Sequence, residues 1–291
     1  MIYDITLAVD YHYASPAGAA RMVLRMLPQT MTGQRLITGL LEIDPRPDDR
    51  RDGYDFFGNA MTEVAFDAPL RELTVRFQGR VERYEAPMGM DLSCPLSVLA
   101  KELAEVNSIG PFSPHHFLGA SERVRPFPAV EAFARETTAP QMSVLSAVQA
   151  ISARLHKEFD FDPSATDVTT DPEVAFENRK GVCQDISHVM IAGLRSLGIP
   201  AGYVSGFLRT VPPEGQARLE GADAMHAWVR AWCGHEIGWV QIDPTNDMPA
   251  GRDHVIVAIG RDYSDVAPVK GSFRTAGEHE TEHAVDVVPV E

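Results

Sequence analysis

Hydrophobic and polar positions alternate along much of residues 1–90, which is the period of β-strands. Residues 5–11 alternate in this way, and residues 73–81 form a second stretch rich in β-forming side chains. Polar turns such as residues 44–49 separate these segments. Closely spaced strands without a helical period predict an all-β, sandwich-like N-terminal domain.

The period becomes helical after residue 140. Ser143 can cap a helix over residues 144–159, whose apolar residues fall on one face. A second amphipathic helix is predicted over residues 183–197, since Gly198 suits a left-handed C-terminal position and Pro200 prevents continuation.

Further strand-like segments follow the second helix. They are residues 201–209, 225–232, 238–242, 255–259 and 285–290. Helices followed by a run of antiparallel strands indicate an α+β arrangement. We therefore expect three parts: an N-terminal β domain over residues 1–90, a proline-rich connector over residues 91–140 and an α+β core over residues 141–291.

Composition excludes some classes of function. Of 291 residues, 44% are hydrophobic and 23% are charged, which is ordinary for a globular protein and excludes wholesale disorder. The 26 lysines and arginines against 41 aspartates and glutamates give a net charge of −15, which argues against nucleic acid or anionic membranes as partners. No segment approaches the roughly 18 uninterrupted apolar residues of a membrane span.

The N-terminal segment and the cysteines indicate a cellular compartment. The segment lacks a basic region, and Asp4 and Asp10 stand where a signal peptide would be apolar. The three cysteines, Cys94, Cys183 and Cys233, are odd in number and far apart, which fits reduced thiols better than a disulfide framework. We expect a cytoplasmic protein.

Cys183 opens the second predicted helix, directly after Gly181 and Val182. Unpaired N–H groups and the positive end of the helix dipole favour a thiolate at such a position. The same groups could hold the oxyanion of a tetrahedral intermediate, and the backbone N–H of Cys183 is our candidate donor. The alternative is that Cys183 is a small buried hydrophobic residue, as most free cysteines are.

The strands over residues 225–232 and 239–245 are expected to form a hairpin. If Gly234-His235 makes a two-residue turn, His226 lies directly opposite Asp243, at a separation that suits a carboxylate accepting from an imidazole. A longer loop makes the two residues diagonal neighbours instead, still on one face of the hairpin.

Cys183, His226 and Asp243 together would supply the nucleophile, the base and the orienting carboxylate of acyl transfer. His226 would take the thiol proton and return it to the leaving amine, while Asp243 would fix the imidazole tautomer and stabilise the imidazolium. Each residue alone has a structural explanation: a core or surface histidine, or an aspartate in the turn before Pro244. Their combination favours the catalytic hypothesis.

Three sequence blocks resemble those of the transglutaminase-like superfamily, in its bacterial branch. They are Gly181-Val182-Cys183-Gln184-Asp185, His226-Ala227-Trp228 and Asp243-Pro244-Thr245-Asn246. Residues 143–163 and 260–266 are similar to stretches that flank these blocks, and residues 55–59 to the β domain that precedes the core in that family. The resemblance covers nearly the whole chain.

The resemblance implies a papain/transglutaminase-like core, in which a helix bearing the cysteine packs on an antiparallel sheet. It also implies thiol chemistry at amide bonds, with catalytic roles for Cys183, His226 and Asp243. Hydrolases and amine transferases both occur in the superfamily. Our first hypothesis is a cysteine-dependent amide-bond hydrolase, a cysteine peptidase that forms a thioester acyl-enzyme. The alternative is a protein-glutamine γ-glutamyltransferase, which passes the acyl group to an amine.

The expected partner is a peptide or protein substrate, the oligomeric state is left open, and no metal or organic cofactor is implied. Two other classes compete with these hypotheses. A non-catalytic interaction module would keep the fold without a reactive thiol. Residues 279–283 match the H-E-x-x-H pattern of zinc metalloproteases, but that pattern needs a helix, whereas this segment alternates with the period of a strand.

Overall fold

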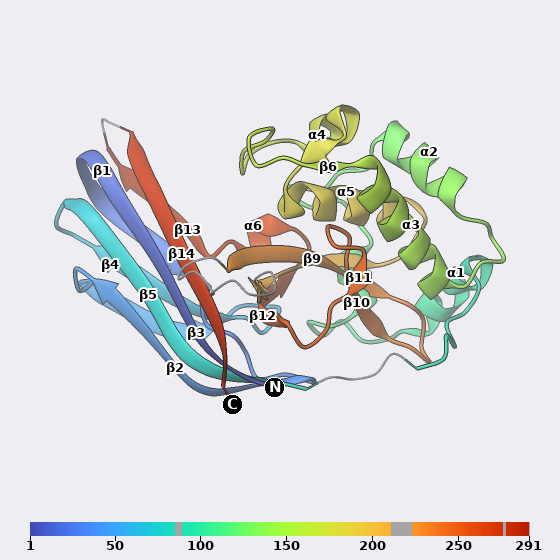
Figure 1. The fold of residues 1–291 in the computed structure, drawn as a ribbon, viewed down its shortest axis with the longest axis horizontal. Coiled ribbons are helices and arrows are strands. Elements are labelled where there is room, and N and C mark those ends of the chain that lie inside the picture. Colours follow the sequence, from blue (N-terminus) through green and yellow to red (C-terminus); the bar gives the residue numbers. More distant parts are fainter. Residues whose placement is uncertain (85–88, 211–222, 276–277, 291) are drawn as a thin grey trace, which may run out of the picture.

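The computed structural model describes residues 1–84, 89–210, 223–275 and 278–290. Figure 1 shows two β-sheets side by side, with most of the helices gathered over one of them and both chain ends at the same end of the other. The mixed α+β architecture expected from the sequence is confirmed, with strands dominating the N-terminal part. Among the described helices, none is both long enough and apolar enough to cross a bilayer.

In the described residues, seven strands form the first sheet, in the order β2-β5-β1-β4-β3, with β13 and β14 also paired to β1. Their bounds are β1 Ile2–Leu24, β2 Gln34–Asp44, β3 Asp49–Tyr54, β4 Ala60–Phe66, β5 Leu70–Arg83, β13 Val269–Arg274 and β14 His279–Val290. The first half of β1 pairs with β5 and β14 and the second half with β4 and β13, with a register shift between them. The sheet therefore curls around its longest strand.

The last two strands complete the N-terminal sheet although they follow the core in sequence. β14 pairs with the whole first half of β1, from Ile2 opposite Val290 to Tyr13 opposite His279. Residues 285–290, grouped with the core strands in the sequence analysis, thus lie in the first sheet. Alternation predicts a strand but not its partner, because the pairing is made between distant segments.

The second sheet has the order β11-β10-β9-β8-β12. Its strands are β8 Ala201–Leu208, β9 Ala224–Trp232, β10 Trp239–Asp243, β11 Met248–Pro249 and β12 His254–Gly260. A short parallel pair joins β6 Asp160–Phe161 to β7 Lys180–Gly181. The helical segments are α1 Leu96–Glu105, the 3₁₀ helix Pro114–Phe117, α2 Pro128–Thr137, α3 Val144–Glu158, α4 Pro172–Asn178, α5 Cys183–Ser196 and α6 Tyr263–Val266.

The two long helices form as the sequence predicts. The Ser143 side chain accepts a hydrogen bond from the Ser146 N–H at 3.2 Å, which caps α3, and the apolar face of α3 is buried. Gly198 follows α5 with φ of +78°, a backbone conformation that favours glycine. α5 packs on β8 and β9 and also contacts α2, α3 and α4. The helix that begins with Cys183 is therefore the central element of the core.

The outer edge of β12 is covered by two side-chain amides from the first sheet. Gln34 donates to the Ile256 carbonyl at 2.7 Å and accepts from the Ile256 N–H at 2.8 Å. Asn59 pairs with Ile259 in the same way, at 2.8 and 2.7 Å. Both amides are almost fully buried. They satisfy backbone groups that an edge strand would otherwise leave unpaired, and they join the two sheets.

Candidate active site

α5 begins at Cys183, and the side chain of Asp185 folds back over the first turn of this helix. Asp185 accepts a hydrogen bond from the Val182 N–H at 2.9 Å and from the Thr166 hydroxyl at 2.6 Å. A Cβ atom at Gly181 would lie 2.6 Å from an Asp185 carboxylate oxygen, so this position before Val182 favours glycine. Burial raises the pKa of Asp185, although its hydrogen bonds oppose this. Asp185 therefore shapes the entry into the helix.

The hairpin that carries His226 and Asp243 has the longer of the two loops considered. Trp232 pairs with Trp239, and the Cys233 N–H donates to the Gly238 carbonyl at 2.7 Å. The direct opposition of His226 and Asp243 that a two-residue turn would give is therefore wrong. Gly238, at φ of +68°, lets the chain close this wider loop. The two residues are diagonal neighbours on one face of the hairpin.

The diagonal arrangement still brings imidazole and carboxylate together. His226 Nε2 lies 2.7 Å from Asp243 Oδ2. The other carboxylate oxygen accepts from the backbone N–H groups of Thr245 and Asn246, at 3.0 and 3.2 Å. Asp243 is fully buried. Burial alone would raise the pKa of Asp243, but the hydrogen bonds it receives, first of all from His226, hold that pKa well below its usual range.

His226 links this carboxylate to the sulfur. Because Nε2 bonds to Asp243, Nδ1 is the ring nitrogen left for Cys183, which borders the same cavity as His226. Burial alone would lower the pKa of His226, but the hydrogen bonds and charges of Asp243 and Cys183 together raise it to about 10. The imidazole is therefore protonated at neutral pH and places a positive charge beside the sulfur.

A second histidine, which no sequence motif indicated, shares the carboxylate. His254 Nε2 lies 3.1 Å from Asp243 Oδ2, and His254 Nδ1 accepts the Gly251 N–H at 3.3 Å. A ring nitrogen that accepts carries no proton, so Nε2 is the protonated nitrogen and donates to Asp243. The ring is almost fully buried and packs edge-on against Trp228, whose centroid is 5.1 Å away.

Cys183 and His226 border a cavity of about 300 Å³ between the two sheets. Val9 and Tyr11 of β1 line it, as does His283 of β14, so the first sheet forms part of its wall. The tryptophans of the hairpin do not line it, which leaves them as packing residues. A substrate that reaches the sulfur would lie between the two sheets.

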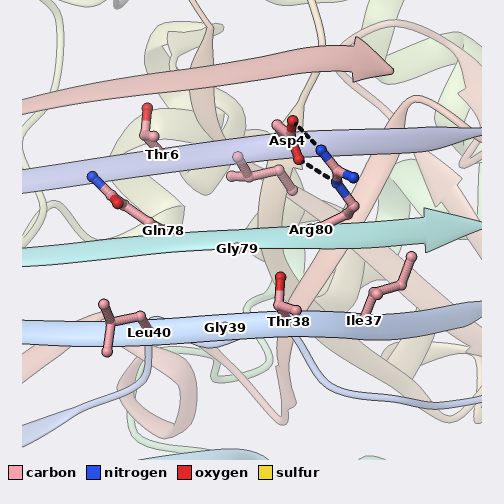
Figure 2. A pocket seen from close by; sticks show the side chains of 10 residues that line it. Asp4, Thr6, Ile37, Thr38, Gly39, Leu40, Gln78, Gly79 and Arg80 are labelled. Atoms are coloured by element: carbon pink, nitrogen blue, oxygen red, sulfur yellow. Dashed lines mark hydrogen bonds and ion pairs between the residues drawn. The ribbon is translucent and has the colours of Figure 1, made fainter. Parts of the chain in front are cut away.

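A hollow of about 570 Å³ on the first sheet has different chemistry. It lies over β1, β2 and β5, as Figure 2 shows, and an ion pair of 2.6 Å joins Asp4 and Arg80 beside it. Its lining includes neither cysteine nor histidine. The cavity of about 300 Å³ is the one that Cys183 and His226 border.

Comparisons with known proteins identify the family. The family model of the transglutaminase-like superfamily matches residues 131–244, and that of the bacterial transglutaminase-like N-terminal region matches residues 3–82. An uncharacterized protein of Mycobacterium tuberculosis is 31% identical over 293 residues, covering 99% of this chain and 93% of that protein. The chain belongs to the transglutaminase-like superfamily. An uncharacterized protein of Mycobacterium leprae is 32% identical over 288 residues, covering 96% of each chain.

The fold of this transglutaminase-like protein agrees with that assignment. The crystal structure of a candidate cysteine protease from Cytophaga hutchinsonii matches it with a TM-score of 0.77, covering 100% of this chain and 91% of that one at 19% identity. The resemblance found in the sequence is thus confirmed for both fold and family. The matched core region ends at residue 244, so His254 lies beyond the part of the chain that the family model describes.

Two groups of side chains in the transglutaminase-like chain could suggest a metal. His226, Asp243 and His254 offer one ligand atom each within 4.8 Å of one another. Hydrogen bonds explain why these three side chains lie together, because one oxygen of Asp243 accepts from both imidazoles. The H-E-x-x-H segment lies in β14, as its alternation predicts. Four residues along a strand separate His279 from His283 by roughly 13 Å, too far to share one zinc ion.

Proposed function

We propose that this protein is a cysteine-dependent amide-bond hydrolase that acts on peptides through a thioester acyl-enzyme at Cys183. The observation that carries the proposal is that Cys183 and His226 border one cavity while Asp243 holds His226 Nε2 at 2.7 Å, which leaves Nδ1 for the sulfur. This is the arrangement of nucleophile, base and orienting group that acyl transfer requires. The fold likeness to a candidate cysteine protease supports the same reading.

The reaction starts from the thiolate and the imidazolium. The sulfur of Cys183 attacks the carbonyl carbon, and the carbonyl oxygen becomes an oxyanion beside the backbone N–H of Cys183, which has no partner within the helix. As the C–N bond breaks, His226 gives its Nδ1 proton to the leaving amine. His226 then takes a proton from water, whose oxygen attacks the thioester. Collapse of this second intermediate releases the acid, and the thiolate and imidazolium are restored.

Trapping of the acyl-enzyme tests this proposal. Activated peptide esters are mixed with the protein, and intact-mass spectrometry is used to follow an acyl adduct, which we expect on Cys183. We expect the adduct to decay to the free acid even when a primary amine is present. Preferential formation of the amide of that amine would replace the hydrolase with a transferase.

Iodoacetamide labelling checks the thiol independently. Burial, together with Glu102, raises the pKa of Cys94 to about 11, and burial raises that of Cys233 to about 12, so both serve as unreactive references in the same chain. Cys183 should react much faster near neutral pH. Equal rates at Cys183 and Cys94 would instead favour a non-catalytic interaction module.

Removal of His254 should slow the reaction without weakening substrate binding. His254→Leu removes a hydrogen bond to a buried, charged carboxylate, an interaction of about 1.5–3 kcal/mol, so kcat should fall about tenfold or more while KM changes little. His254→Gln keeps an N–H donor and should recover part of the loss. Steady-state kinetics, normalised by titration of reactive Cys183, measure the effect. Equal activity of both variants and the wild type per reactive thiol would contradict this positioning role.

A further inference from the structure

The cavity beside Cys183 is bounded by both sheets of the protein. From the core come Tyr203 of β8 and residues next to the reacting groups, and from the first sheet come Tyr11 of β1 and Thr281 of β14. β14 also touches the start of β9: Asp223 accepts the Val287 N–H at 2.7 Å. The first sheet is therefore held in place as a wall of the cavity.

Apart from the imidazolium of His226, which is already paired with Asp243, the described residues that line this cavity carry no fixed charge. Charged residues make up 23% of the chain, so about three would be expected among fifteen lining residues. Yet none of the fifteen is aspartate, glutamate, lysine or arginine. A charged side chain of a substrate would lose its hydration here, and the one positive charge within reach, on His226, is already paired with Asp243. The cavity therefore favours an uncharged group.

Three tyrosines supply neutral polar groups to this lining. Burial raises the pKa of Tyr11 to about 12 and also raises those of Tyr203 and Tyr263, so all three phenols are neutral donors. Among the described residues, none accepts a hydrogen bond from these hydroxyls. Neutral hydroxyl donors suit an oxygen of an amide or an alcohol. At about 300 Å³, the cavity is at the small end for ligand sites and fits one side chain of a peptide.

We infer that the cavity between the two sheets is the subsite for the acyl-donor peptide, and that it selects an uncharged polar side chain next to the scissile bond. The inference rests on the proposed function, since it places the acyl group at Cys183. It gives the N-terminal sheet a role in substrate selection through β1 and β14. Asparagine and aspartate side chains test it directly, because they have nearly the same shape and differ in charge.

Binding to Cys183→Ala protein tests the subsite without requiring turnover. The probes are fluorescent acetylated tripeptide amides with asparagine or aspartate at the central position. We expect the asparagine peptide to bind at least tenfold more tightly, which corresponds to about 1.4 kcal/mol. Equal dissociation constants would overturn the inference.

A charge placed on the wall should cancel this preference. Thr281→Lys, added to the Cys183→Ala protein, puts a cation on the exposed rim of the cavity and should strengthen binding of the aspartate peptide at least tenfold. Ala284→Lys is the matched control, because position 284 is exposed on the opposite face of the same strand and its variant should leave both affinities unchanged. Equal affinities of the Thr281→Lys and Ala284→Lys variants for the aspartate peptide would contradict the assignment of this cavity as the subsite. Selective binding without an acyl adduct on wild-type protein would contradict the proposed hydrolase alone.

Discussion

Cys183→Ala is expected to lower kcat for amide cleavage by at least roughly 10⁴-fold, the largest effect of any single substitution in this protein. The substitution removes the only atom that forms the acyl-enzyme in the proposed mechanism. Peptide affinity should change little, because the rest of the cavity lining is retained. The measurement is single-turnover hydrolysis of the peptide that wild-type protein cleaves best.

Cys94→Ala is the matched control for this loss. Cys94 is partly buried and packs against the hydrophobic core, so its variant makes the same chemical change away from His226. Its activity should stay close to that of the wild type. If Cys183→Ala kept its activity and a chelator removed it, the reaction would belong to a zinc hydrolase.

Asp243→Asn should reduce kcat by roughly 10³–10⁴-fold while keeping the shape of the side chain. Without the carboxylate, burial lowers the pKa of His226, so the imidazolium is no longer favoured at neutral pH. An amide can also donate to the ring and hold the wrong tautomer. In the wild type, kcat/KM should fall as the pH rises through about 10; in the variant, this alkaline limb should move to lower pH. If kcat/KM fell at the same alkaline pH in Asp243→Asn as in the wild type, Asp243 would not be the group that keeps His226 protonated.

The Asp243→Asn substitution should also change how the free energy of unfolding depends on pH. The pKa of His226 is raised above 6.5, so the contribution of the pair is complete below that pH and is lost as the pH rises through about 10. The pKa of Asp243 is depressed, so the contribution is lost as the pH falls below about 3.8. The free energy of unfolding, measured with urea, should therefore differ most between wild type and Asp243→Asn near pH 5, and should differ less near pH 10. Asp160→Asn, at an exposed position, should show no such trend.

The sequence predicts most of the local structure around the candidate site. The helix that begins at Cys183 was expected from its apolar face and from Gly198, and it forms as expected. The one-sided placement of His226 and Asp243 also follows from strand periodicity. The loop between their strands was not predictable, because the longer loop needs a positive φ at Gly238 as well as at Gly234, and the sequence pattern does not distinguish this from a tight turn at Gly234 alone.

Features made by distant segments were beyond the sequence pattern. His254 begins a strand that pairs with β8, and its contact with Asp243 depends on how the sheet is assembled. No spacing rule connects it to the hairpin. The same holds for β14, whose alternation is clear but whose partner is the first strand of the chain.

The position of β14 has a consequence for protein synthesis. The ribosome makes Cys183, His226 and Asp243 well before residues 279–290, and these last residues complete the curled sheet and one side of the cavity. A nascent chain that stops before β14 would carry Cys183, His226 and Asp243 without one side of the cavity. The cavity is therefore closed only after β14 has been translated and has paired with β1.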